Sequence, residues 1–151
     1  MKIKSIIQSL LFLAFILSFG FKLDNLSRFN ITIQQNKNSQ KANNGIGPIK
    51  EVKLGSIDKR LVDKGSDIFN DKCSACHDID DVNLAPALRG VTKVLSPVFI
   101  MNYLMNTTEM QQKDPYVKSL MQQWKKVPVM KDQHLKKDEA RAVLEFLRTK
   151  N

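Results

Sequence analysis

The chain has 151 residues, a net charge of +9 and only two cysteines. This length corresponds to about one folded domain. Residues 1–21 carry +2, residues 22–55 carry +4 and residues 56–151 carry +3, so the C-terminal part is only mildly basic. Seven lysines lie between Lys113 and Lys137, without the arginines or interleaved aromatic residues of nucleic-acid-binding proteins. They indicate either solvated helix faces or a lysine-rimmed docking surface.

The first 21 residues predict a signal peptide or an N-terminal membrane anchor. Lys2 and Lys4 precede a nearly continuous apolar run that begins at Ile6. The run is about 16 residues long, which is short for a membrane span, and Ser18 and Gly20 are small residues suited to cleavage. Because the two lysines stay in the cytoplasm, either interpretation places the rest of the chain in the periplasm.

Residues 22–55 are rich in Asn, Gln, Lys and Ser and have few large apolar side chains after Ile33. Such a segment buries too little surface to offset the entropy lost on ordering, so we expect a flexible linker. Residues 56–151 are then the folded domain, which is long enough to bury a modest core.

The domain is predicted to be all-α, with about four short helices. Apolar residues recur at helical spacing in residues 56–72, 96–105, 114–124 and 136–150. Two of these segments begin with a capping residue followed by proline, at Ser96 and at Asp114. So few helices cannot pack the long loops between them, so we expect an apolar group between helices and loops.

The stretch DKCSACHDID, residues 71–80, contains both cysteines and one of the two histidines. At this spacing the thiols of Cys73 and Cys76 can add across the two vinyl groups of a haem, and the adjacent His77 can bind its iron. A porphyrin would also fill the space between helices and loops. The motif therefore predicts one covalently attached haem c with its iron.

Other uses of the two cysteines are less well supported. A thioredoxin-like redox pair requires a βαβ unit, which the sequence does not predict. A zinc site requires four well-spaced ligands, and adjacent Cys76 and His77 would crowd a tetrahedron. A disulfide between Cys73 and Cys76, in an exported domain without haem, stays open but leaves His77 without a role.

The order of motifs resembles that of the single-haem class I cytochromes c, over the whole of residues 56–151. In that family a Gly-x-x-x-aromatic helix precedes CxxCH, and a proline loop, middle helices, a methionine loop and an aromatic last helix follow. The matching residues here are Gly65, Phe69, Cys73, Cys76, His77, Pro86, Met130 and Phe146. The resemblance implies the cytochrome c fold, in which the first helix crosses the last near Gly65 and Phe146.

The same resemblance implies a role for each residue of the site. It implies haem attachment at Cys73 and Cys76 and iron ligation by His77 and Met130. The Pro86 carbonyl is expected beside the ring N–H of His77, where it would fix the orientation of the ring.

Met121 and His134 remain alternatives to Met130 as the distal ligand. Met130 is favoured because it lies in a loop after Pro128, whereas the other methionines lie on or beside helical segments, where methionine usually fills the core. The chain departs from the family in two places. Lys131 follows the methionine where the family has proline, and a lysine stands where the family has Ser or Thr before the last helix. These departures predict a looser methionine loop.

A six-coordinate iron leaves no open position for a substrate, so the expected function is electron transfer rather than catalysis. Residues 45–58, GIGPIKEVKLGSID, together with CSACH resemble single-haem cytochromes that accompany nitrous-oxide reductase in some bacteria. The expected partners are an electron donor and a respiratory reductase or oxidase, with no nucleic acid. The alternative is a five-coordinate haem sensor or peroxidase-like enzyme, in which Met130 leaves the distal position open.

Overall fold

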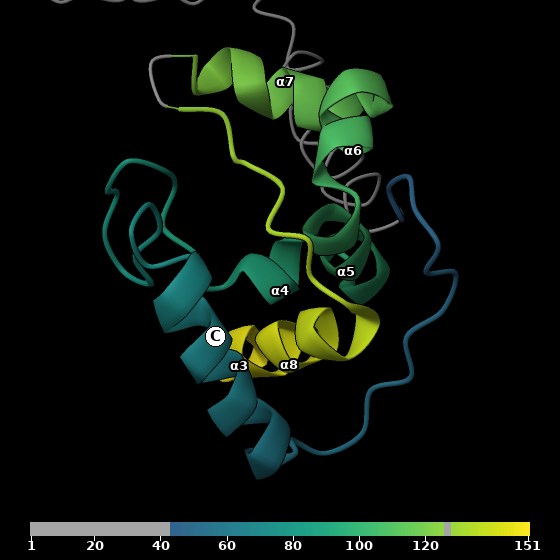
Figure 1. Ribbon diagram of the computed structural model, residues 1–151, viewed down its shortest axis with the longest axis vertical. Coiled ribbons are helices and arrows are strands. Elements are labelled where there is room, and N and C mark those ends of the chain that lie inside the picture. The colour runs from purple at the N-terminus through teal and green to yellow at the C-terminus, as the bar shows by residue number, and fades with distance from the viewer. Residues whose placement is uncertain (1–42, 126–127) are drawn as a thin grey trace, which may run out of the picture. The chain divides into compact units, whose positions relative to one another are not determined.

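The computed structural model describes residues 43–125 and 128–151 (Figure 1). These residues form α3 (Lys59–Lys72), α4 (Val91–Val94), α5 (Pro97–Met105), α6 (Thr107–Lys113), α7 (Pro115–Gln123) and α8 (Lys137–Arg148), with no strand among them. The all-α prediction is confirmed. Helices α4 and α6 are additional to the four expected, because segments this short show no helical repeat.

The expected leader and the first part of the expected linker, residues 22–42, lie outside the described residues. In the ranges that the structure does describe, no helix combines the length and hydrophobicity needed to cross a bilayer.

Polar residues start the helices where the sequence predicts them. The Ser96 hydroxyl accepts a hydrogen bond from the amide of Phe99 at 3.0 Å, and Asp114 accepts two from the first turn of α7, at 2.9 and 3.0 Å. At α8 the Glu139 carboxylate accepts from the amide of Lys136 at 2.7 Å. This is the one of the two capping-box hydrogen bonds that the N3 side chain makes. It partly replaces the bond that a Ser or Thr side chain would make at the N-cap position, where this chain has Lys136.

Helices α3 and α8 pack with their backbones in direct contact at Gly65. A Cβ atom at Gly65 would lie 2.5 Å from the carbonyl carbon of Ala142 and 2.9 Å from the Cβ of Phe146. One turn further along α3, the rings of Phe69 and Phe146 are 5.3 Å apart between centroids. The expected crossing is therefore present, and it requires glycine because no side chain fits between the helices.

A buried carboxylate also ties the start of α3 to α8. The Glu145 side chain is fully buried and accepts hydrogen bonds from Arg148 at 2.7 Å, from Arg141 at 3.3 Å and from the amide of Asp58 at 3.2 Å. A buried carboxylate is stable in this setting because both oxygens have partners.

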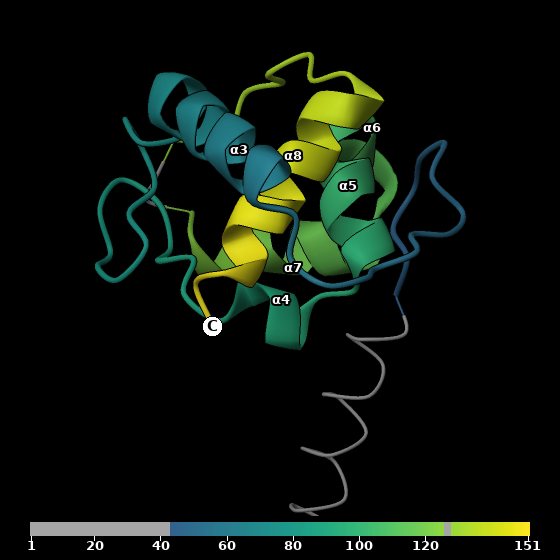
Figure 2. The same ribbon diagram turned by 90° about the horizontal axis from the view of Figure 1, so that it is seen from below.

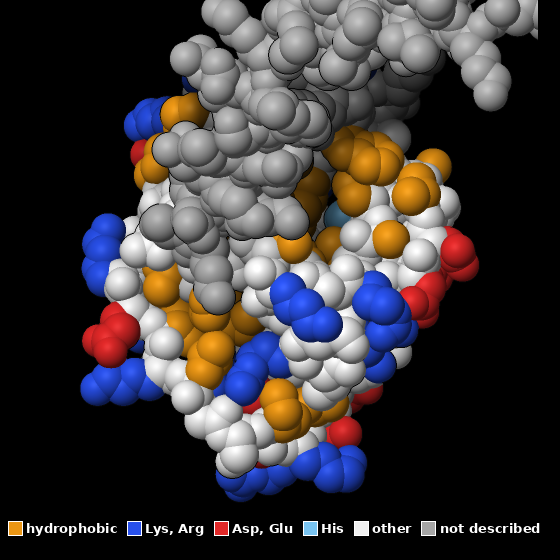
Figure 3. All heavy atoms as spheres, turned by 180° about the vertical axis from the view of Figure 1, so that it is seen from behind, with side chains coloured by type: hydrophobic (Ala, Val, Ile, Leu, Met, Phe, Trp, Pro, Cys, Tyr) orange, Lys and Arg blue, Asp and Glu red, His pale blue; other side chains and the backbone are white. Residues whose placement is uncertain are grey.

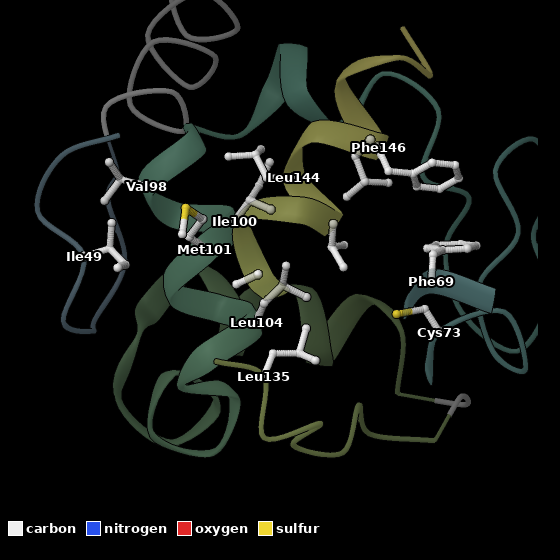
Figure 4. Close-up of a cluster of buried hydrophobic side chains, with 13 residues drawn as sticks. Ile49, Phe69, Cys73, Val98, Ile100, Met101, Leu104, Leu135, Leu144 and Phe146 are labelled. Carbon is white, nitrogen blue, oxygen red and sulfur yellow. The ribbon is translucent and has the colours of Figure 1, made fainter. Parts of the chain in front are cut away.

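The hydrophobic core lies between α3, α5 and α8 (Figure 4). Its buried members are Ile49, Phe69, Cys73, Val98, Ile100, Met101, Leu104, Leu135, Ala140, Val143, Leu144, Phe146 and Leu147. A second cluster of Phe99, Met110 and Val117 joins α5, α6 and α7. We call these the main core and the small core.

Residues 43–58, here called the N-terminal strap, pack against the domain, which corrects the prediction of a linker through residue 55. The strap runs past α5 and α8 to the start of α3 (Figures 1 and 2). Ile49 of the strap is buried in the main core. Asn102 of α5 accepts from the Ile49 amide at 2.9 Å and donates to the carbonyls of Ile49 at 3.0 Å and Asn44 at 2.9 Å. The strap is ordered by these hydrogen bonds together with the burial of Ile49. The partners of its backbone lie far away in the sequence, so its composition does not reveal them.

We predict that Gly65→Ala lowers the free energy of unfolding of the haem-loaded protein by about 3 kcal/mol, because the added methyl group forces two backbones apart. Chemical denaturation measures this change. Gly55→Ala is the matched control, since a Cβ atom there meets nothing within 4 Å. Equal stability of the two variants would show that the crossing tolerates a side chain.

Asn102→Ala should lower the free energy of unfolding by about 2–3 kcal/mol, because it leaves buried main-chain groups of the strap without partners. Hydrogen exchange of the Ile49 amide should accelerate in the variant. Asn83→Ala is the control, since Asn83 is exposed and its side chain forms no hydrogen bond within the described residues. Unchanged exchange at Ile49 in Asn102→Ala would contradict the role given to Asn102.

Candidate haem-binding site

The turn at the end of α3 brings Cys73, Cys76 and His77 together. The Cys73 carbonyl oxygen accepts hydrogen bonds from the amides of Cys76 at 3.0 Å and His77 at 2.9 Å. Cys73 is buried, Cys76 is exposed and His77 is half-buried. The Cys73 sulfur points toward the middle of the main core (Figure 4). A flat group joined to both thiols would therefore lie at the edge of the core, with one side in contact with solvent.

His77 is oriented by the loop that follows it. Its Nδ1 lies 2.9 Å from the carbonyl oxygen of Pro86. Because a carbonyl oxygen can only accept, the hydrogen lies on Nδ1, and in the neutral ring the lone pair lies on Nε2. The ring is thus held with Nε2 able to bind a metal, and the contact expected between His77 and Pro86 is present.

The same loop is closed by main-chain and charged contacts. The Arg89 amide donates to the carbonyl of Ile79 at 2.7 Å, and the Arg89 guanidinium forms an ion pair with Asp80. The hydrogen bond from Arg89 holds the pKa of Asp80 below its usual value. These contacts fix the path of the chain on both sides of Pro86.

The surroundings of the two cysteines and of His134 differ from one another. The thiols of Cys73 and Cys76 are not joined to each other. Burial raises the pKa of Cys73 to about 11, so this thiol is neutral at pH 7. No cluster of three or more His, Cys, Asp or Glu side chains able to hold a metal ion occurs in the described ranges. His134, which a zinc site would need, has a side chain that is 87% exposed.

The three candidates for the distal ligand lie in different surroundings. Met130 packs against the main core, which contains Cys73. Met121 packs against the small core instead, and the His134 side chain faces solvent. The structure therefore brings Met130 alone of the three to the cluster that borders the cysteine turn.

A hydrogen bond that the sequence does not predict holds the backbone of Met130. Gln111 lies on α6, and its side-chain Nε2 donates to the Met130 carbonyl oxygen at 2.6 Å. The adjacent Gln112 is of the same type and is exposed. No sequence signal distinguishes the two, because a segment as short as α6 shows no clear buried face.

The lysines of residues 113–137 lie mostly at the surface. Lys113 pairs with Glu109 at 2.9 Å. Lys118, Lys125, Lys131, Lys136 and Lys137 are exposed. On the face shown in Figure 3, hydrophobic side chains gather in patches with Lys and Arg side chains around them, and a histidine is partly visible between hydrophobic groups. Basic and apolar groups are thus both accessible near the surface of the domain.

Comparison with known proteins identifies the family. The family model for cytochrome c matches residues 62–151. The solved structure of cytochrome c from Rhodothermus marinus is 44% identical, covers 68% of this chain and 88% of its own, and superposes with a TM-score of 0.64. An engineered form of that cytochrome, bound to a carbene intermediate, is 42% identical, with coverages of 68% and 88% and a TM-score of 0.61. No curated protein matched the chain.

These matches confirm the cytochrome c fold expected from the order of the motifs. The family match spans the cysteine turn, the Pro86 loop, the methionine loop and α8. The chain belongs to the cytochrome c family, the class I c-type cytochromes, which bind haem c covalently and transfer electrons through its iron.

Proposed function

We propose that this protein is a one-electron carrier with a single haem c attached through Cys73 and Cys76, its iron bound by His77 and Met130. The observation that carries the proposal is the 2.9 Å hydrogen bond between His77 Nδ1 and the Pro86 oxygen. It holds the ring in one tautomer with Nε2 unprotonated, which is the form of imidazole that binds a metal.

The residues at the turn fit a haem. The Cys73 sulfur points into the main core, and the exposed Cys76 provides the second attachment on the solvent side. The haem supplies the Fe(III)/Fe(II) couple when it is bound. Attached in this way, it would bury its faces against apolar side chains and leave one edge accessible to a partner.

Met130 determines whether the protein is a carrier or an enzyme. Its packing against the main core, which contains Cys73, supports Met130 as a residue whose thioether would hold the iron together with His77. If His77 and Met130 both held the iron, no position would remain for a substrate, and a thioether in an apolar pocket would favour reduced iron and raise the reduction potential.

We also propose that the protein works in the periplasm, free or tethered to the membrane by residues 1–21. The support is the sequence, in which Lys2 and Lys4 precede a long apolar run. As partners we propose an upstream electron donor and a respiratory reductase, with nitrous-oxide reductase as the specific candidate. The support for this candidate is the resemblance of residues 45–58 to cytochromes that accompany that enzyme.

A second candidate function is an open-site haem sensor or enzyme. It is favoured by one observation, namely that an engineered form of the Rhodothermus marinus cytochrome holds a carbene intermediate. In the present chain this function requires that Met130 does not bind the iron.

The visible spectrum of the haem-loaded protein separates the two functions. The oxidised protein should show the weak long-wavelength band of sulfur bound to iron, and Met130→Ala should abolish it. Met121→Ala is the matched control and should keep the band, because Met121 packs in the small core. A covalent haem without the band, which binds carbon monoxide readily when reduced, would support the open site instead.

The lysine-rimmed docking surface makes a separate prediction. The second-order rate of electron transfer to nitrous-oxide reductase should fall several-fold as ionic strength rises from about 0.01 M to about 0.15 M, because the Debye length shrinks from roughly 30 Å to roughly 8 Å. Lys131→Glu should slow the low-salt reaction more than Lys59→Glu, which changes an exposed lysine on α3. A rate that does not change with salt would contradict the lysine-rimmed docking surface, but it would not contradict the carrier function.

A further inference from the structure

One side chain of α6 holds the backbone of the methionine loop, residues 128–136, at Met130. Gln111 Nε2 donates to the Met130 carbonyl oxygen at 2.6 Å. The other hydrogen bonds of this loop join near neighbours, such as the amide of His134 and the carboxylate of Asp132 at 2.8 Å. At its end the loop joins α8, where the Lys136 amide donates to Glu139 at 2.7 Å. Among the described residues, the bond from Gln111 is the one that connects the backbone of this loop to a helix other than α8.

The loop needs such a connection because its own backbone is irregular. His134 has a φ of 50°, in the left-handed region that a residue with a side chain rarely adopts. Lys131 follows Met130, so no proline restricts the backbone there. Val129 is 55% exposed. The remaining anchors of the loop are the side chains of Met130 and Leu135 in the main core.

Helix α6, which carries Gln111, is itself held firmly. Its Met110 is fully buried in the small core. The Asn106 side chain donates to the carbonyl of Ile46 in the strap at 3.1 Å. Gly45 of the strap, with a φ of +65°, approaches so closely that a Cβ atom there would lie 2.5 Å from Met110 Cε. The strap thus contacts α6 at Asn106 and at Met110, and the neighbouring Gln111 reaches the methionine loop.

Gln111 also lies beside Tyr103, a half-buried residue of α5. Burial raises the pKa of Tyr103, and a hydrogen bond with the Gln111 side chain opposes that shift. The amide of Gln111 therefore occupies a defined place between α5 and the methionine loop, unlike the exposed Gln112 next to it.

We propose that Gln111 is a positioning residue that fixes the backbone of Met130 and so keeps its thioether in place as the distal ligand. The inference rests on the proposed function, because it gives Gln111 a role only when Met130 binds the iron. Removing the donor leaves the side chain of Met130 in the core but lets its backbone move, which makes the thioether easier to displace. The role of Gln111 is thus to oppose displacement rather than to touch the iron.

The test compares Gln111→Glu with Gln112→Glu in the haem-loaded full chain. Both changes keep the side-chain length and add one negative charge, but only the first removes the donor to Met130. Titration of the oxidised protein with imidazole, followed by loss of the sulfur-to-iron band, measures how readily Met130 is displaced. Loss of one hydrogen bond predicts roughly 3- to 10-fold tighter imidazole binding in Gln111→Glu, and no change in Gln112→Glu.

Gln111→Leu removes the donor without adding charge and should behave as Gln111→Glu does. Imidazole binding equal to wild type in both variants at position 111 would overturn the inference and leave the carrier function standing. Tighter binding in Gln112→Glu as well would also overturn it, because charge alone would then be the cause. A wild-type protein without the sulfur-to-iron band would instead overturn the ligand role of Met130, and the role of Gln111 with it.

Discussion

The backbone contact between α3 and α8 at Gly65 is the constraint on which the rest of the domain depends. Gly65, Phe69 and Cys73 are spaced four residues apart, so they lie on one face of α3. The first touches the backbone of α8, the second packs against Phe146, and the third enters the main core. Close approach at Gly65 is therefore what delivers the cysteine turn to the edge of the core.

The parts of the site that hold His77 and Met130 are built from different segments of the chain. The His77 side is local, since the turn of residues 73–77 and the Pro86 carbonyl lie within 14 residues of one another. The Met130 side is assembled from distant segments, namely the methionine loop, Gln111 of α6, and the strap that contacts α6 through Asn106. A local arrangement can be inferred from spacing along the sequence, whereas a distant one depends on how the helices pack.

This difference explains how much of the structure the sequence predicts. The capping pairs at Ser96 and Asp114 mark helix starts, and the cysteine motif marks the His77 side, because each signal spans only a few residues. The polar composition of residues 22–55 predicts a flexible linker, although side chains far away in the sequence bind the backbone of residues 43–55. Helices α4 and α6 are too short for a helical repeat of apolar residues to show. Nothing in the sequence distinguishes Gln111, which binds the backbone of Met130, from the exposed Gln112.

Three amide side chains on neighbouring helices perform the same physical task. Asn102, Asn106 and Gln111 each bind main-chain groups of a segment without regular structure, two of them in the strap and one in the methionine loop. An amide carries both donors and an acceptor, so it can satisfy irregular backbone that has no partner strand or helix. Helix α6 packs against α5 and α7, while α3 packs against α8. A change in the strap or in α6 should therefore shift the backbone of Met130 before it affects His77. The orientation of His77 depends on the contact with Pro86 within its own loop.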